Sequence, residues 1–308
     1  MFAAAMPTFS ILIPVYNEER FLEEIVQRVL EAPLPEMPDA AEPIRKELVL
    51  VDDASTDGTP GVIERLAGRH PEIRAFRQPR NLGKGGAIRR AIEEMTGDFA
   101  IIQDADLEYD PAEYPLVLGP IVGGEADVVY GSRFLAHRRW TDWFVLHRAA
   151  NRFLTLLSNV TTGLRLSDME TCYKAFRGDL LHSIPLRSNR FGIEPEITAK
   201  VARRGAEICE VPISYYGRLY SEGKKIGWKD GISAIWTILK YWWIDDSSKS
   251  DEPSTAGKNS KRRPSSMAVN ENDSPGHSGS ATTTRSVTGP SSRKRSGCPC
   301  DRRPGHWR

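Results

Sequence analysis

The stretch that decides the fold is Phe99-Ala100-Ile101-Ile102-Gln103-Asp104-Ala105-Asp106-Leu107-Glu108. Its first half is apolar, as a buried strand requires, and its second half carries a carboxylate at every other position. In an extended chain this alternation predicts that Asp104, Asp106 and Glu108 point towards one side. Crowded carboxylates repel one another unless a cation neutralises them, and their oxygens suit Mg²⁺ or Mn²⁺. The run therefore predicts a strand that ends at a divalent-cation site, although an acidic loop that caps a helix from Pro111 also fits.

Outward from this stretch, between Phe9 and Arg133, short apolar runs alternate with longer helical patterns. This alternation is typical of βαβ units, in which helices cover both faces of a mostly parallel sheet. The predicted strands are Phe9–Val15, Glu47–Val51, Ile73–Arg77, Phe99–Gln103 and Asp127–Tyr130. The predicted helices are Glu18–Glu31, Thr59–Ala67, Gly85–Met95 and Pro111–Val122, preceded by the turn or capping residues Asn17, Asp57 and Asp110. The fold class is therefore α/β, arranged as a Rossmann-like scaffold for a nucleotide.

The pattern continues to residue 246 and then changes. The predicted elements of this second part are helices at 145–160, 195–204 and 228–243 and strands at 172–176 and 207–215. We expect one domain over residues 1–246, with halves at about 8–133 and 134–246. Residues 247–308 are rich in Ser, Thr, Pro and Gly, and their Lys and Arg outnumber their Asp and Glu. Such a segment buries too little apolar surface to fold, so we expect a disordered basic tail.

The overall composition excludes several classes of protein. With 40% hydrophobic and 27% charged residues, the chain is ordinary for a soluble globular protein. Its four cysteines form no CxxC pair and have no histidines at zinc-finger spacing, which argues against a disulfide framework and a structural zinc site. No secretory leader and no apolar stretch of about 18 residues is present, so we expect a cytoplasmic protein without a transmembrane helix.

Polar residues follow the first two predicted strands, at the sheet edge where open α/β sheets bind ligands. After the first strand comes Pro14-Val15-Tyr16-Asn17-Glu18, where a nucleotide base could stack on Tyr16. A capped helix start with an exposed tyrosine explains this segment equally well. After the second strand, the carboxylates of Asp52 and Asp53 can accept hydrogen bonds from ribose hydroxyls or a base edge. A polar βα loop, with Asp57 capping the next helix, is the alternative.

A glycine-rich segment, Asn81-Leu82-Gly83-Lys84-Gly85-Gly86, precedes the third helix. Its glycines permit close approach of the backbone, and Lys84 can offset phosphate charge. The spacing matches neither a Walker A loop nor GxGxxG. The absence of GxGxxG argues against a dinucleotide-dependent dehydrogenase.

These motifs together resemble the family 2 glycosyltransferases with the GT-A fold, in the group of dolichol-phosphate mannose synthase and the bacterial polyprenyl-phosphate sugar synthases. The resemblance covers about residues 8–244. It is carried, in the family's order, by Pro14–Glu18, Val51–Asp57, Asn81–Gly85, Asp104–Asp106, Gly131–Arg133, Asp168–Thr171 and residues 210–225. Each motif is common by itself, but the ordered set is specific.

The resemblance implies a role for each matching residue. Pro14, Tyr16, Glu18 and Asp53 would hold the nucleoside and Asp104 the ribose or donor. Asp106 and Glu108 would ligate Mg²⁺ or Mn²⁺, with Glu108 standing where the family often has Gln.

After the fifth predicted strand, Arg133 and, on the next helix, Arg152 look like an acceptor-phosphate site, since a guanidinium offers a fork of donors. A charge on the helix surface is the alternative for Arg152. Asp168 would lie near sugar and acceptor, where it either removes a proton or, because a phosphate is already ionised, positions the reactants.

Two later segments complete the predicted site. The loop from Ile213 to Lys225 is predicted to be a lid whose Arg218 and Lys224 contact the donor diphosphate. The last helix has an apolar stripe, Ile232, Ile235, Trp236, Leu239, Trp242 and Trp243, which is typical of core. With Trp140, Trp143 and Phe144 it could instead meet a membrane surface, and the basic tail could attract anionic lipids.

We therefore predict an inverting transfer of a hexose from a nucleotide diphosphate sugar to a polyprenyl monophosphate. GDP-mannose is the favoured donor, with UDP-glucose and UDP-GlcNAc possible. We expect peripheral contact with the cytoplasmic face of a membrane and no specific nucleic-acid partner. One alternative is transfer to a hydroxyl of a glycan or small molecule. Another is a nucleotide-sugar-binding or membrane-associated protein without catalysis.

Overall fold

The computed structural model describes residues 6–37, 43–136, 145–217 and 228–243. These residues build a seven-stranded sheet with the order β3-β2-β1-β4-β6-β5-β7. The strands are β1 (Thr8–Val15), β2 (Arg45–Asp52), β3 (Ile73–Arg77), β4 (Phe99–Ile102), β5 (Val128–Ser132), β6 (Lys174–Arg177) and β7 (Ile208–Pro212). All neighbouring pairs are parallel except those of β6, which is antiparallel to β4 and β5. The predicted α/β class with a mostly parallel sheet is confirmed.

Strand β1 lies in the middle of the sheet because it is apolar on both faces. Seven of its eight residues are buried, as expected for a parallel strand covered by helices on both sides. Ile11 pairs with Leu48 of β2 and with Ile101 of β4. The carboxyl ends of these three strands therefore meet at one edge of the sheet.

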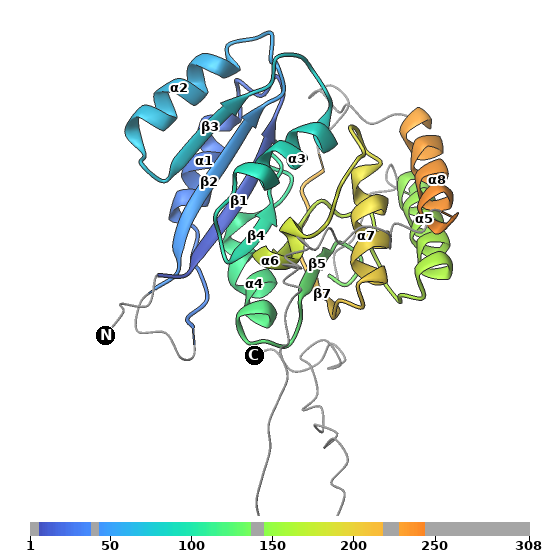
Figure 1. The fold of residues 1–308 in the computed structure, drawn as a ribbon. Helices are drawn as coiled ribbons and strands as arrows, with labels where there is room; N and C mark the ends of the chain where they lie inside the picture. Colours follow the sequence, from blue (N-terminus) through green and yellow to red (C-terminus); the bar gives the residue numbers. More distant parts are fainter. Residues whose placement is uncertain (1–5, 38–42, 137–144, 218–227, 244–308) are drawn as a thin grey trace, which may run out of the picture. The chain divides into compact units, whose positions relative to one another are not determined.

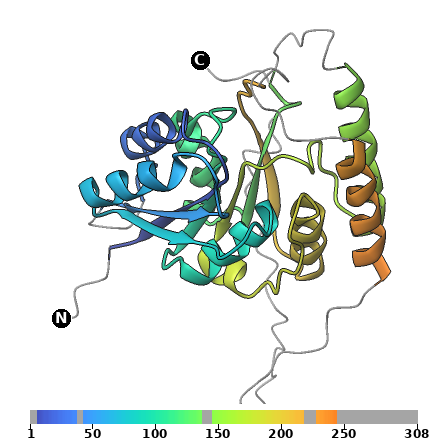
Figure 2. The ribbon, with the colours of Figure 1, turned by 90° about the horizontal axis from the view of Figure 1, so that it is seen from above.

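Helices cover both faces of the sheet, as Figures 1 and 2 show. One core joins β1 to α1 (Leu22–Glu31), α2 (Thr59–Arg69) and α4 (Tyr114–Val122), with the 3₁₀ turn η1 (Pro111–Glu113) before α4. The core on the other face is formed by α3 (Lys84–Glu94), α6 (Gly178–His182), α7 (Ile193–Arg203), α5 (Val145–Thr162) and α8 (Trp228–Trp243). The molecule is thus layered, with α5 and α8 packed beyond α7 (Figure 2).

Several predicted boundaries were wrong. Helix α1 begins at Leu22 instead of Glu18, because Asn17 has a φ of 55° and turns the chain after β1. Strand β7 ends at Pro212 instead of Tyr215. Strand β4 ends at Ile102, so the acidic residues that follow are not in an extended strand.

Strand β6 connects the two predicted halves within one sheet. It comes from the second half, yet it lies between β4 and β5 of the first half. Its main chain is anchored next to the end of β5, where Gly131 N donates to Tyr173 O over 2.8 Å. Residues of both halves therefore contribute to the same edge. Among the described helices, none has the length and apolarity that crossing a membrane requires.

Candidate functional site

The loops at the carboxyl ends of β1, β2 and β4 are held in an unusual backbone conformation. Asn17, Ala54 and Leu107 have φ values of 55°, 59° and 61°, and they are the non-glycine residues with positive φ in the described part of the chain. Such a conformation is disfavoured for residues with a side chain and is maintained only when the surroundings impose it. Each of the three follows a different strand, so the strain is concentrated at one edge of the sheet.

The first two loops hold each other by hydrogen bonds. Asn17 N donates to Ser55 Oγ over 3.0 Å, and Thr56 N donates to Asn17 Oδ1 over 2.8 Å. Glu18 N donates to Thr59 Oγ1 over 3.0 Å. Asn17 therefore joins two loops instead of capping α1, which corrects the predicted cap. Asp57 precedes Gly58, the N-cap of α2, and its Oδ1 accepts from Thr59 N over 3.0 Å, so it binds a main-chain donor of the first turn without being the N-cap.

Three predicted nucleoside contacts lie on the first loop. Pro14 and Tyr16 are half-buried, and Glu18 is buried. They are brought to the same edge as Asp53, which follows β2.

The carboxylate of Asp53 is engaged by the glycine-rich segment. It accepts from Leu82 N over 2.8 Å and from Gly83 N over 2.7 Å, and its side chain is buried. Burial raises the pKa of Asp53, while the two backbone donors act in the opposite direction. Gly83 has a φ of 84° at this point, which is why a glycine is needed. In this structure Asp53 organises the loop before α3, and its contact with a nucleoside remains a prediction.

Lys84 lies at the start of α3 and is surrounded by acidic partners. Its Nζ is 2.7 Å from Asp104 Oδ1, 3.4 Å from Glu194 Oε1 and 2.7 Å from Cys172 Sγ. Burial favours the neutral amine, but these neighbours outweigh it and raise the pKa of Lys84 well above its ordinary value. Lys84 is therefore charged. It contacts the segment after β4, the segment before β6 and the first turn of α7. Glu194 and Cys172 were not predicted as part of the site.

The acidic run turns sharply after β4. Residues 105–109 form turns and bends, and Leu107 has a positive φ. The expectation that Asp104, Asp106 and Glu108 alternate along an extended strand was therefore wrong. Asp104 faces Lys84, whereas Asp106 Oδ1 accepts from Glu108 N over 3.3 Å within the turn.

The turn offers two carboxylates as oxygen donors. Glu108 is fixed by Tyr215, whose hydroxyl donates to Glu108 Oε2 over 2.8 Å. Among the described residues, no group of three or more His, Cys, Asp or Glu is arranged to hold a metal ion. Two carboxylates suit a Mg²⁺-type ion, which usually takes one or two of them and completes its shell with substrate phosphates and water.

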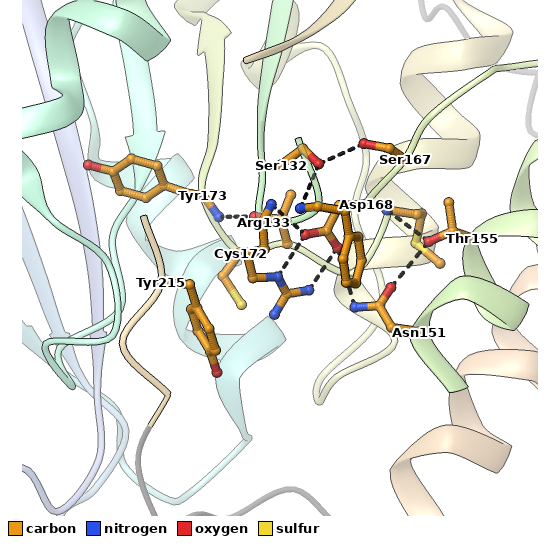
Figure 3. Close-up of polar contacts among 12 residues, drawn as sticks. Ser132, Arg133, Asn151, Thr155, Ser167, Asp168, Cys172, Tyr173 and Tyr215 are labelled. Atoms are coloured by element: carbon orange, nitrogen blue, oxygen red, sulfur yellow. Dashed lines mark hydrogen bonds and ion pairs between the residues drawn. The ribbon is translucent and has the colours of Figure 1, made fainter. Parts of the chain in front are cut away.

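Arg133 and Asp168 form a buried two-pronged ion pair (Figure 3). Arg133 Nε donates to Oδ2 and Nη2 donates to Oδ1, both over 2.7 Å. Arg133 N also donates to Oδ2 over 3.1 Å. Asp168 is fully buried, and the Arg133 side chain is 14% exposed. Burial opposes the charge of Arg133, yet the Asp168 carboxylate raises the pKa of the guanidinium well above its usual value.

The surroundings of Asp168 come from two further elements, α5 and β7. Asn151 Nδ2 of α5 donates to Asp168 Oδ1 over 3.3 Å, and Thr155 of the same helix accepts from Met169 N over 3.1 Å. Glu210 of β7 accepts from Asp168 N over 3.0 Å. Figure 3 shows Asn151 and Thr155 reaching the loop from one side. Sequence reasoning missed these residues; the one sequence signal was the i, i+4 pair of polar residues on α5.

Tyr215 lies between the acidic turn and the ion pair. Its hydroxyl binds Glu108, and the Arg133 guanidinium carbon is 5.2 Å from its ring centroid. Its ring also lies 5.4 Å from that of Tyr109. The acidic turn and the Arg133–Asp168 ion pair are therefore parts of one site.

Glu170 is half-buried close to this site, with its Oε1 atom buried. Burial, followed by the nearby charge of Glu194, raises the pKa of Glu170 to about 8. Its Oε1 accepts no hydrogen bond from the part of the chain that the structure describes. Lys174 lowers the pKa of Glu170, but less than those two causes raise it, so Glu170 is largely protonated at neutral pH.

The remaining predicted residues are not brought into this cluster. Arg152 is exposed on α5, whereas its neighbour Asn151 contacts Asp168. Arg218 and Lys224 lie outside the described residues, as do Trp140, Trp143 and Phe144. The predicted tail also lies outside them.

Comparison with protein families gives a match over most of the described body. The model described as "Glycosyl transferase family 2" matches residues 10–184. An undecaprenyl-phosphate mannosyltransferase of Micrococcus luteus is 29% identical over 241 residues, covering 75% of this chain and 94% of the relative. A dolichol-phosphate mannosyltransferase of Pyrococcus furiosus is 26% identical, covering 71% of this chain and 59% of its own length.

A third relative is named as the transferase of a different sugar. The undecaprenyl-phosphate 4-deoxy-4-formamido-L-arabinose transferase of Sodalis glossinidius is 32% identical over 218 residues, covering 70% of this chain and 62% of the relative. The chain thus spans less than two thirds of this relative and of the Pyrococcus one.

Solved structures give the same fold. Glucosyl-3-phosphoglycerate synthase of Mycobacterium tuberculosis, solved with Mn²⁺, uridine diphosphate and phosphoglyceric acid, matches with a TM-score of 0.58 at 22% identity. The match covers 78% of this chain and 80% of that one. The same enzyme with Mg²⁺ and uridine diphosphate gives a TM-score of 0.56. The predicted GT-A fold is confirmed.

Proposed function

Since the chain belongs to glycosyl transferase family 2, we propose that this glycosyltransferase moves a hexose from a nucleotide diphosphate sugar to a polyprenyl monophosphate. The names of three relatives support a polyprenyl phosphate as acceptor, and two of them are mannosyltransferases. GDP-mannose is therefore the favoured donor, ahead of UDP-glucose and UDP-GlcNAc. Because such an acceptor is anchored in a bilayer, the reaction takes place at the cytoplasmic face of a membrane.

The observation that carries this proposal is the orientation of Arg133. Its Nε and Nη2 are used by Asp168, while Nη1 donates no hydrogen bond to a described residue. The guanidinium is thus held in a fixed orientation, and the two protons on Nη1 are bound by no described residue. Such a group is suited to a phosphate oxygen. In the proposed reaction Arg133 binds the acceptor phosphate and aims its oxygen at the anomeric carbon.

Asp168 acts in this proposal as a positioning residue. Both of its oxygens accept hydrogen bonds from Arg133, so it is poorly placed to take a proton. A phosphate monoester already carries ionised oxygens at neutral pH. The transfer therefore needs no strong base, in agreement with the second of the two roles considered for Asp168.

Asp106 and Glu108 are the residues that would hold the divalent cation. They provide two hard oxygen donors on one turn, next to the pair of Lys84 and Asp104. A bound Mg²⁺ or Mn²⁺ would neutralise the charge of the departing nucleoside diphosphate. Structural neighbours that were solved with Mn²⁺ or Mg²⁺ and uridine diphosphate support this assignment.

The donor site is proposed to use the loops that follow β1 and β2. Pro14, Tyr16 and Glu18 would contact the nucleoside on the edge that Asp53 organises. Lys84 keeps the Asp104 carboxylate in place through its 2.7 Å ion pair, so that Asp104 can meet the ribose or donor. Arg218 and Lys224 would contact the diphosphate.

The test is a transfer assay with the full chain. Purified protein, Mg²⁺ or Mn²⁺ and undecaprenyl phosphate are incubated with GDP-mannose, UDP-glucose or UDP-GlcNAc, and lipid-linked product is identified by mass. Arg133→Gln should lower kcat/KM for the acceptor about 10- to 100-fold, the worth of a charge-assisted hydrogen bond. Arg28→Gln, an exposed arginine on α1, is the matched control and should not change it.

Two results would contradict the proposal. One is the absence of lipid-linked product with all three donors. The other is a product in which the sugar is joined to the hydroxyl of a glycan or small molecule while the polyprenyl phosphate stays unmodified. If Arg152→Gln lowers kcat/KM for the acceptor and Arg133→Gln does not, the phosphate site lies on α5.

A further inference from the structure

Tyr215 is a half-buried residue that follows β7 and contacts both parts of the site. Its hydroxyl donates to Glu108 Oε2 over 2.8 Å, and its ring centroid lies 5.2 Å from the guanidinium carbon of Arg133. One side chain thus contacts a proposed cation ligand with its hydroxyl and the proposed phosphate ligand with its ring. Because the two contacts use different atoms, they can be removed separately.

The main chain on both sides of Tyr215 is fixed by hydrogen bonds. Ile213 N donates to Ser132 O over 3.1 Å, at the end of β5. Tyr216 N donates to Glu108 O over 2.9 Å, in the acidic turn. The position of Tyr215 is therefore set relative to both β5 and the acidic turn. Such preorganisation lowers the cost of ordering the site when a ligand binds.

The contact with Glu108 orients one carboxylate of the proposed cation site. An ionised carboxylate has about four lone-pair sites, so Glu108 can accept the tyrosine hydrogen bond and still ligate a metal ion. Carboxylates that bind metals are commonly held in this way, and removing the hydrogen-bond donor typically weakens metal binding about 10- to 100-fold. Asp106 Oδ1 accepts from Glu108 N over 3.3 Å, so the two carboxylates of the turn are oriented together.

The contact with Arg133 holds the guanidinium from a second side. Asp168 accepts from its Nε and Nη2, and the guanidinium lies over the Tyr215 ring (Figure 3). A cation is attracted by the negative face of an aromatic ring, and a guanidinium can make this contact while its N–H groups bind oxygen atoms. Tyr215 therefore restricts the movement of Arg133 without occupying the N–H groups that the acceptor phosphate needs.

We propose that Tyr215 is a positioning residue that connects the divalent-cation site to the acceptor-phosphate site, with its hydroxyl orienting Glu108 and its ring orienting Arg133. This inference rests on the proposed function, because it takes Glu108 as a cation ligand and Arg133 as the phosphate ligand. The transfer needs both ligands in fixed relative positions, since a small misplacement of reacting groups slows a reaction strongly. Tyr215 is the side chain that contacts both of them.

A purely structural role of Tyr215 makes a different prediction. Its ring lies 5.4 Å from that of Tyr109, so Tyr215 also contributes to packing. Packing depends on the ring, and Tyr215→Phe preserves the ring. A loss in Tyr215→Phe that concerns the divalent cation therefore arises from the hydroxyl.

The first test is calorimetric binding of GDP and of UDP to the full chain, each with Mn²⁺ and each with EDTA. Tyr215→Phe should bind the Mn²⁺–nucleotide complex about 10- to 100-fold more weakly than the wild type, and the metal-free nucleotide within about twofold of it. Tyr130→Phe is the matched control, because it also removes one buried hydroxyl, which is joined to Thr198 Oγ1 over 2.9 Å on the other face of the sheet. It should bind both forms like the wild type.

The second test separates the two contacts by kinetics. Tyr215→Phe should raise the Mn²⁺ concentration that gives half-maximal transfer about tenfold or more and leave KM for undecaprenyl phosphate unchanged. Tyr215→Leu also loses the ring, so it should in addition raise that KM about 3- to 30-fold, the range expected for a cation over an aromatic ring. In a Glu108→Ala background, Tyr215→Phe should change the metal dependence by less than about twofold, because the carboxylate that it orients is gone.

Three results would overturn the positioning role: unchanged binding of the Mn²⁺–nucleotide complex by Tyr215→Phe, equal weakening of the Mn²⁺ and metal-free forms by that variant, or an unchanged KM for undecaprenyl phosphate in Tyr215→Leu. Transfer by the wild type together with any of these results would leave the proposed function intact. Weaker Mn²⁺–nucleotide binding by Tyr215→Phe without any transfer by the wild type would uphold the contact with the cation site and reject the polyprenyl phosphate acceptor.

Discussion

Replacing Asp168 by alanine tests the ion pair on which the acceptor site depends. The change removes the acceptor of three hydrogen bonds from Arg133 and leaves the guanidinium, only 14% exposed, without its counter-charge. Removing one partner of a buried ion pair costs about 3–5 kcal/mol. In a domain of this size 1 kcal/mol corresponds to about 2–4 °C in Tm. We therefore expect Tm to fall by about 6–20 °C.

The measurement is thermal unfolding followed by circular dichroism at neutral pH. Asp179→Ala is the control, because Asp179 also pairs with an arginine, Arg177, over 2.5 Å, but its side chain is 68% exposed. An exposed pair contributes only about 0–1 kcal/mol. The control should therefore shift Tm by less than about 4 °C.

The double variant Asp168→Ala, Arg133→Met separates stability from function. It removes both buried charges, which is often neutral for stability, so it should recover most of the Tm lost in Asp168→Ala. It should not recover transfer, because Arg133 is the proposed phosphate ligand. The reasoning is refuted if Asp168→Ala unfolds within about 2 °C of the wild type, or if the double variant is no more stable than the single one.

Three further predictions concern the donor side of the site. Asp106→Asn and Glu108→Gln should each raise the Mg²⁺ concentration that gives half-maximal transfer by about tenfold or more without changing Tm. EDTA should abolish transfer until Mg²⁺ or Mn²⁺ is returned. Equal metal dependence in wild type and variants would exclude Asp106 and Glu108 as metal ligands. Lys84→Met leaves two carboxylates without their cation, so Tm should fall by several degrees; an unchanged Tm would show that its ion pairs contribute little. The pKa of Glu170 is about 8 in the folded protein, against 4.5 for an unperturbed glutamate, so its contribution to stability is full below about pH 4.5 and is lost as pH rises through about 8. Glu170→Gln should therefore flatten the dependence of Tm on pH between these values, and an identical pH profile in the variant would contradict the raised pKa.

Much of the fold could be predicted from local pattern. The apolar run Phe9–Val15 became β1, because a parallel strand that is buried on both faces needs apolar side chains along most of its length. The mixed stretch Ile73–Arg77 became β3, in which Ile73 is buried and the other residues are partly or fully exposed. The predicted helix at 228–243 was correct to the residue. Two of the boundaries that failed, at α1 and at the acidic turn, lie where Asn17 and Leu107 adopt positive φ. Contacts between loops impose that conformation, and local propensity does not encode it.

The sequence by itself determined the α/β class, the family and the identity of the polar residues that follow the strands, because hydropathy period and motif order are local properties. Only the tertiary structure decided which of those residues meet. The insertion of β6 between β4 and β5 brings Asp168 to Arg133 and Glu194 to Lys84, pairs that are far apart in sequence and are selected by strand order. Likewise, the helical period shows that Trp236 and Leu239 share a face, but the packing of α8 against α7 decides that this face points outward.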